Sequence, residues 1–142
     1  MLSEANDFTM DLFGVEINTF LDSVLDVIYE FGGDRRIVFT SFSPEMCMAL
    51  AMRQQTYPIL FLNESCTAKW PTHDIRAISV QTAIHFARGL GIDGVVMASD
   101  PFVASPRLVK KVQDHGLICW SFGNMNDDPD NALVRLPWDP AE

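Results

Sequence analysis

The chain has 142 residues, of which 48% are hydrophobic, and it carries a formal net charge of −9 at pH 7. This length is typical of a single domain, and the hydrophobic content is sufficient to form a core. The acidic balance argues against binding to nucleic acid, which requires clustered lysine and arginine, and disfavours an anionic membrane surface. No apolar run reaches the roughly 20 residues that a membrane span needs.

The amino-terminal segment 1–13 is polar and weakly patterned, and we expect it to be irregular. It has no basic region followed by an apolar stretch, so it does not resemble a signal peptide.

Cys47, Cys66 and Cys119 form no Cys-x-x-Cys pair. Cys47 and Cys119 lie in apolar segments, where packed thiols are expected. Together these features predict a reducing, cytoplasmic setting.

The first predicted element is a helix that begins near residue 17 and ends at Gly32 and Gly33. Its apolar residues recur at steps of three and four, which places most of them on one helix face. They are Ile17, Phe20, Leu21, Val24, Leu25, Val27, Ile28 and Phe31.

Four short apolar runs follow, at 37–42, 58–62, 94–99 and 117–122. They are rich in β-branched and aromatic residues and have the length of strands. The runs are nearly continuous and not strictly alternating, as in parallel strands that are covered on both faces.

Helical segments lie between these predicted strands. Ser43-Pro44-Glu45 combines a helix cap, a proline at the first helical position and an acid in the first turn. Ser79 is expected to open a second helix, and Ser105-Pro106 a third that Gly116 closes. Ser99 and Asp100 are candidates to cap a short helix that begins at Pro101.

The alternation of helices and strands predicts an α/β fold with right-handed parallel crossovers. Both an open doubly wound sheet and part of a (β/α)8 barrel agree with this order. The sequence has no phosphate-binding glycine motif. The chain is shorter than the 200–250 residues of a complete barrel, and residues 132–142 do not form a final helix and strand pattern.

Five segments occur in an order and spacing that resemble a known family. They are 35–50, 57–65, 74–96, 105–123 and 126–131. Together they resemble the C-terminal part of a glycerophosphodiester phosphodiesterase domain. The resemblance is greatest to the large fungal glycerophosphocholine phosphodiesterases, which carry an SPX domain and ankyrin repeats ahead of the catalytic barrel. It implies that residues 14–131 form about strands four to seven of a (β/α)8 TIM barrel that lacks its first strands and its last. Residues 132–142 would form an atypical acidic tail.

The resemblance implies hydrolysis of a glycerophosphodiester such as glycerophosphocholine to glycerol 3-phosphate and an alcohol. The family uses a divalent cation, Mg²⁺ or Ca²⁺, and a pair of histidines for acid–base catalysis. Its motifs are a His-Arg-Gly, a Glu-x-Asp, a later His and a Glu-Leu-Lys, and none of them occurs in this sequence. Glu16 is better interpreted as an acid at the start of the first helix. We therefore assign no catalytic or metal-binding residue and expect the chain alone to be inactive.

Four residues are candidates for substrate binding because they lie at the carboxyl ends of the first and last predicted strands, where barrel active sites form. They are Ser41, Phe42, Phe122 and Asn124. The resemblance places Phe122 where the family usually has Trp or Tyr, an aromatic face suited to glycerol or to a quaternary ammonium. The alternative interpretations are a turn hydroxyl for Ser41, core packing for the two rings and a turn for Asn124.

Other polar residues carry weaker functional interpretations. Arg76 either meets a phosphate or forms a surface ion pair, and Ser99 is a candidate for a contact at the rim of the sheet. Trp120 is more consistent with core packing. The histidines, at positions 73, 85 and 115, lack metal-ligand spacing.

Three hypotheses follow for the function. In the first, the chain is a piece of a glycerophosphodiester phosphodiesterase, for example a truncated gene product. In the second, it is an inactive half-barrel that acts as a binding or regulatory module. A half-barrel has two open sheet edges, which favour self-association. The third hypothesis is an unrelated α/β protein with a cysteine nucleophile, but no cysteine lies beside a histidine at a strand end.

Overall fold

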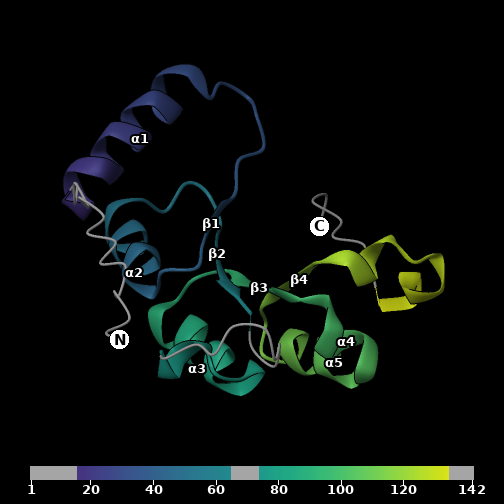
Figure 1. The fold of residues 1–142 in the computed structure, drawn as a ribbon. Helices are drawn as coiled ribbons and strands as arrows, with labels where there is room; N and C mark the ends of the chain where they lie inside the picture. The colour runs from purple at the N-terminus through teal and green to yellow at the C-terminus, as the bar shows by residue number, and fades with distance from the viewer. Residues whose placement is uncertain (1–15, 65–73, 135–142) are drawn as a thin grey trace, which may run out of the picture.

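A computed structural model describes residues 16–64 and 74–134 of the chain. Its centre is a four-stranded, fully parallel sheet with the strand order β1-β2-β3-β4 (Figure 1). The predicted α/β fold is therefore confirmed. The predicted irregular segment 1–13 and residues 135–142 of the predicted tail lie outside the described residues.

The strands are β1 (Phe39–Ser41), β2 (Ile59–Asn63), β3 (Gly94–Ala98) and β4 (Ile118–Phe122). All four fall on the predicted apolar runs. Neighbouring strands in the sheet are also neighbours in sequence, which is the order that successive right-handed crossovers produce.

The α-helices are α1 (Ile17–Phe31), α2 (Pro44–Arg53), α3 (Val80–Leu90), α4 (Ser99–Ala104) and α5 (Arg107–Gln113). Three 3₁₀ helices complete the described elements: η1 (Ile75–Ala77), η2 (Asn124–Asp127) and η3 (Pro129–Val134). Figure 1 shows the helices in an arc around the sheet, with α1 at one end and α4 and α5 at the other.

Local hydrogen bonds explain where three of the helices begin. The Glu16 carboxylate accepts from the backbone N–H groups of Asn18 and Thr19, at 3.1 and 3.0 Å, so Glu16 caps α1. Ser43 Oγ accepts from the backbone N–H of Met46 at 3.1 Å. Ser79 forms a reciprocal capping box with Thr82. The predicted starts at these three helices are confirmed.

The predicted start of the third helix at Ser105-Pro106 is confirmed: Pro106 occupies the N-cap position of α5, and the Ser105 carbonyl accepts from the backbone N–H of Leu108 at 3.0 Å. The predicted cap at Ser99 is wrong. Ser99 is the first residue inside α4, and no side-chain hydrogen bond caps that helix. At α5, Pro106 begins the helical turn because its φ angle is already fixed near the helical value. α4 instead begins at Ser99 itself, two residues before Pro101, so the Ser99 hydroxyl is not at the cap position.

The two faces of the sheet differ in what covers them. Phe61 packs edge-to-face against Phe86 of α3 at a centroid distance of 4.9 Å, so the Phe61 side chain faces the helices. The residues in register with Phe61 on the other strands, and every second residue from these along each strand, face the same way. This helix-facing layer forms the main core. Its buried strand residues are Ile59, Phe61, Val95 and Met97, and they pack against helix residues that include Leu21, Leu25, Cys47, Leu50, Ala83, Ile84, Phe102 and Val109.

The other face presents the intervening residues of each strand. Leu60, Val96 and Ala98 lie there and are buried, but they do not belong to the main core cluster. Trp120 is in register with Val96 and is half-buried on the same face. We call this the open face, because the helices of the core cluster pack on the other side. Among the described helices, none is long and apolar enough to cross a membrane.

Candidate functional site

Two phenylalanine rings meet at the carboxyl-terminal rim of the sheet. Phe42 follows β1 and Phe122 ends β4, and their rings pack edge-to-face with centroids 5.9 Å apart. These strands are the two outer strands of the sheet. Three strand spacings laid flat would separate β1 from β4 by about 14 Å, so the sheet must curl to bring the rings together. The Phe42–Phe122 pair therefore bridges the open face at its rim.

Phe42 remains 53% exposed although it contacts Phe122. It is therefore not a core ring, which was the alternative interpretation of this residue. Phe122 is half-buried and in register with Ala98 of β3, on the open face. An exposed aromatic pair at the carboxyl ends of parallel strands offers both a ring face and a ring edge to a ligand.

Ser41 lies on the opposite side of the sheet from these rings. It is in register with Phe61, which places it toward the helices. Its hydroxyl accepts a hydrogen bond from the backbone N–H of Ser43 at 3.1 Å, and its carbonyl accepts one from the Cys47 thiol at 3.7 Å. Ser41 thus stabilises the turn that directs the chain from β1 past Phe42 into α2.

The polar loop after β4 is a turn built on one asparagine. Asn126 Oδ1 accepts from the Ser121 hydroxyl at 2.9 Å, and its Nδ2 donates to the Ser121 carbonyl at 3.0 Å. Its backbone N–H donates to the carbonyl of Gly123. Asn124 begins η2 and is exposed, so its side chain is accessible at the rim.

Ser99 is a buried hydroxyl at the carboxyl end of β3. Only 1% of the residue is exposed, and its Oγ has no hydrogen-bond partner among the described residues. Gly123 lies against it with a φ of +113°, and a Cβ at position 123 would come within 3.0 Å of Ser99 Oγ. Glycine is thus required at position 123 by its φ angle, and its absent side chain leaves the space that Ser99 fills.

A second buried polar residue was not recognised from the sequence. Asn63 ends β2 and is 1% exposed. The only signal was its position directly after an apolar run, in the segment Leu-Asn-Glu. A strand-end asparagine is also common in turns, so this signal is weak without the structure.

Arg76 forms ion pairs on the helix side of the molecule. Its guanidinium donates to both oxygens of Asp74 and to Glu45, and lies 5.7 Å from the centroid of the Phe86 ring. These hydrogen bonds hold the pKa of the Asp74 and Glu45 carboxyls below their usual values. They also raise the pKa of Arg76. The ion-pair interpretation of Arg76 is therefore confirmed.

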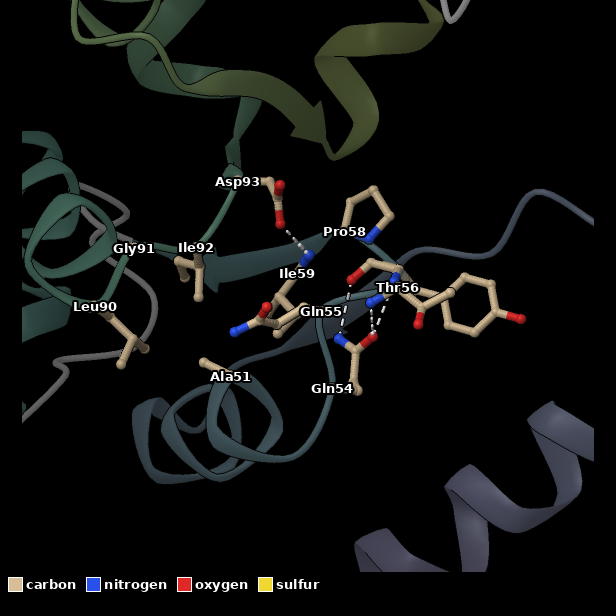
Figure 2. Close-up of a pocket in the computed structure, with 11 residues that line it drawn as sticks. Ala51, Gln54, Gln55, Thr56, Pro58, Ile59, Leu90, Gly91, Ile92 and Asp93 are labelled. Atoms are coloured by element: carbon tan, nitrogen blue, oxygen red, sulfur yellow. Dashed lines mark hydrogen bonds between the residues drawn. The ribbon is translucent and has the colours of Figure 1, made fainter.

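A pocket of about 300 Å³ lies at the amino-terminal end of the sheet, away from the aromatic rim (Figure 2). Gln54, one of its lining residues, is buried and accepts from the backbone N–H groups of Thr56 and Tyr57, while its Nε2 donates to the Tyr57 carbonyl. Asp93 accepts from the backbone N–H of Ile59 at 2.8 Å. These side chains fix the entry to β2, so the polar residues at this end of the sheet have a structural role.

The described residues do not fit a divalent cation site. No cluster of three His, Cys, Asp or Glu occurs among them. Several carboxylates are already engaged within the chain: Asp22 with Arg53, Glu45 and Asp74 with Arg76, Asp114 with Lys110, and Asp93 with a backbone amide. His85 is exposed on α3, and His115 Nδ1 lies 2.7 Å from the carbonyl of Lys111, while His73 falls outside the described residues.

The cysteines in the described part of the chain are poor nucleophiles. Burial raises the pKa of the Cys47 thiol to about 12, and burial raises the pKa of Cys119 to about 12 as well. A thiol with such a pKa is almost entirely protonated at neutral pH, which argues against cysteine catalysis at these positions.

Comparison with known proteins identifies the family. The model of the glycerophosphoryl diester phosphodiesterase family matches residues 1–141. A protein of Eremothecium gossypii named glycerophosphocholine phosphodiesterase GDE1 is 41% identical over 96% of this chain and 10% of its own length. A Schizosaccharomyces pombe protein of that name is 38% identical over 96% of this chain and 12% of its own. The human glycerophosphocholine phosphodiesterase GPCPD1 is 31% identical over 82% of this chain and 17% of its own length.

No solved structure gave a significant match. The chain spans about a tenth of the length of the fungal relatives, so the similarity covers one part of much longer proteins. That part corresponds to nearly all of this sequence, and the match extends over the strands and helices described above. The chain belongs to the glycerophosphoryl diester phosphodiesterase family.

Proposed function

We propose that the chain is a part of a (β/α)8 barrel that hydrolyses glycerophosphodiesters such as glycerophosphocholine. Residues 14–131 would supply about strands four to seven, and 132–142 a separate acidic tail. Family membership and the names of the relatives support the reaction. The parallel sheet, with its helices packed on one face and an apolar open face opposite, supports the barrel.

The observation that carries this proposal is the Phe42–Phe122 pair. A substrate in a barrel lies over the carboxyl ends of the strands, which is where this pair lies. Its exposed ring surface suits the alcohol part of the substrate, and a quaternary ammonium is attracted to aromatic faces. Asn124 would add a polar contact at the rim, and Ser41 would position Phe42 through the turn that its hydroxyl stabilises.

The chain's contribution is substrate binding and not proton transfer. In the family a divalent cation, Mg²⁺ or Ca²⁺, stabilises phosphate charge, but the donor set of the described residues does not fit one. The cation ligands and the histidine pair would come from barrel strands outside this chain. A cytoplasmic setting belongs to the same proposal, and the free thiols of Cys47 and Cys119 agree with a reducing compartment. A role in lipid metabolism would follow from the proposed substrate.

Reconstitution with the missing strands tests the proposal. The chain would be co-expressed with the amino-terminal barrel part of a fungal relative, and release of glycerol 3-phosphate from glycerophosphocholine would be followed with and without EDTA. We expect EDTA-sensitive hydrolysis from the complex and none from the chain alone. In the complex, Phe42→Ala should raise KM for glycerophosphocholine, while Met52→Ala, at an 85% exposed position on α2, should leave it unchanged.

Two results would contradict this assignment. One is EDTA-sensitive turnover by the chain alone, which would place the catalytic groups within it. The other is a stable complex that shows no hydrolysis of any glycerophosphodiester.

A second candidate function is a non-catalytic module that binds through its open sheet edges, including to another copy of itself. The observation in its favour is that, in the described sheet, β1 pairs only with β2 and β4 only with β3. Sedimentation that shows a stable, folded monomer at all concentrations would count against it.

A further inference from the structure

We propose that two copies of this chain associate around a two-fold axis into a closed eight-stranded barrel, in which β4 of each copy pairs with β1 of the other. This inference rests on the barrel architecture proposed above, but it does not depend on hydrolysis. The partner is therefore a second copy of this chain. The two new strand pairs are equivalent by symmetry, as in an isologous dimer.

The first argument is the number of helix–strand units. Contacts show α2 on β1 and β2, α3 on β2 and β3, and α5 on β4. A further helix, α1, precedes β1, and only 3₁₀ helices follow β4 among the described residues. The described residues thus contain four helix–strand units, half of the eight that close a barrel. In the dimer, α1 of one copy would cover the junction next to β4 of the other, where the described residues hold no α-helix.

The second argument is an apolar stripe on α1 that is exposed at three of its five positions, while Ile17 and Val24 are half-buried. Leu21 and Leu25 are buried toward α2. Beside them, Phe20, Val27 and Phe31 are 47%, 56% and 62% exposed. Residues 17, 20, 24, 27 and 31 repeat at alternate steps of three and four, and all five are apolar. This is the spacing of a helix face that packs against another element, so α1 has a second packing face in addition to the one on α2.

The third argument is the geometry of the sheet edges. Both edge strands run parallel to the rest of the sheet. A two-fold axis along the barrel axis preserves strand direction, so β4 and the partner's β1 would also be parallel. The Phe42–Phe122 contact shows that the sheet is already curled across its open face. Closure would remove both open edges, which otherwise expose unpaired backbone groups.

The fourth argument is charge complementarity between the two helices that the dimer would bring together. α1 carries Asp22, Asp26 and Glu30 and no basic residue, whereas α5 carries Arg107, Lys110 and Lys111 and no acidic residue. Within one chain these helices lie at opposite ends of the arc (Figure 1). Lys111 Nζ donates to Gln81 of α3, and Lys110 lies about 100° further around α5. Within one chain Asp22 pairs with Arg53 and Lys110 with Asp114. The dimer would bring Asp26 and Glu30 of α1 toward the basic α5 of the partner, in which Arg107 opens the helix.

Analytical ultracentrifugation over a range of concentrations tests the association. We expect a reversible dimer with about twice the 15.9 kDa mass of the chain. Val27→Asp and Phe31→Asp should each weaken the dimer at least about tenfold, because each buries a charge in the proposed contact. Ile75→Asp is the matched control, since Ile75 is 74% exposed on η1, away from both sheet edges, and should leave the dimer unchanged. Circular dichroism would confirm that every variant is folded.

A charge exchange tests the orientation of the two copies. Arg107→Glu together with Lys110→Glu should weaken the dimer severalfold, because α5 then has a net charge of −1 against the acidic α1. Adding Asp26→Lys and Glu30→Lys should restore association, because α1 then has a net charge of +1 and the two helices again carry opposite charges. A folded monomer at every concentration overturns the proposal, as does a dimer that Val27→Asp and Phe31→Asp leave intact. A chain that stays monomeric but binds the amino-terminal barrel part of a fungal relative also overturns the dimer, while the proposed function stands.

Discussion

The Phe42–Phe122 contact should couple the two outer strands of the sheet energetically. We consider a double-mutant cycle of Phe42→Ala, Phe122→Ala and the combined variant. The contact is the only ring–ring pair described between β1 or its following residue and β4, and its centroids are 5.9 Å apart. If it fixes the curl of the sheet, removing either ring should lose most of the stabilisation that the pair provides.

The magnitude follows from the exposure of Phe42. Full burial of a phenylalanine side chain contributes about 1.5–3 kcal/mol, and Phe42 is 53% exposed, so its burial contributes roughly 1 kcal/mol. An edge-to-face aromatic pair adds about 0.5–1.5 kcal/mol beyond burial. Phe42→Ala should therefore lower the free energy of unfolding by about 2 kcal/mol. The coupling energy of the cycle should be about 1 kcal/mol, because the ring–ring contact is lost in each single variant but only once in the double variant.

Urea unfolding followed by tryptophan fluorescence measures these free energies, because Trp120 lies in β4 beside Phe122. All variants must be compared at one protein concentration, since self-association adds to apparent stability. Met52→Ala, at an 85% exposed position, should change stability by less than about 0.5 kcal/mol. A coupling energy near zero, with both single variants destabilised, would refute the idea that this contact holds the two edges together.

Three further predictions follow from other contacts. Ser79→Ala removes half of the capping box of α3 and should cost about 1 kcal/mol in urea unfolding, and a cost near zero would contradict the capping role. Cys47 and Cys119, whose pKa values burial raises to about 12, should react with a thiol reagent at pH 8 only after unfolding. Peptide mapping separates them from Cys66, and rapid labelling of either residue in the folded chain would contradict this prediction. Arg76 lowers the pKa of Glu45 from 4.5, so this pair should stabilise the fold above that pH and cease to do so as the pH falls below it. Because both side chains are partly exposed the effect should be small, and Arg76→Gln should flatten the acid limb of the stability profile if the assignment is correct.

The strands and the main helices could be predicted because local signals and tertiary packing agree. The four apolar runs are both good strand sequences and the buried centre of the sheet. Ser43 and Ser79 precede helical patterns and cap them in the structure. Ser105 carries the same local signal and does not cap α5, because Pro106 already has a helical conformation.

The candidate site was less predictable because it depends on contacts between distant segments. Phe42 and Phe122 are separated by 80 positions in the sequence, and only the curl of the sheet brings their rings together. Register decides that Ser41 faces the helices while Phe42 faces the rim, and a single sequence does not give the register. Ser99 was interpreted as a cap or a rim contact, since burial of its hydroxyl against Gly123 leaves no trace in local composition.

The side-chain hydrogen bonds at the amino-terminal end of the sheet have a consequence for local unfolding. Gln54 ties together the backbone of residues 54–57, and Asp93 holds the first amide of β2 (Figure 2). Local opening that exposes these amides must break the side-chain bonds as well as the strand ladder. Hydrogen exchange at Tyr57 and Ile59 should therefore be slower than at Asn124, which follows β4 in an exposed turn. Such a gradient would leave the carboxyl-terminal end of the sheet free to adjust while the opposite end remains closed to exchange.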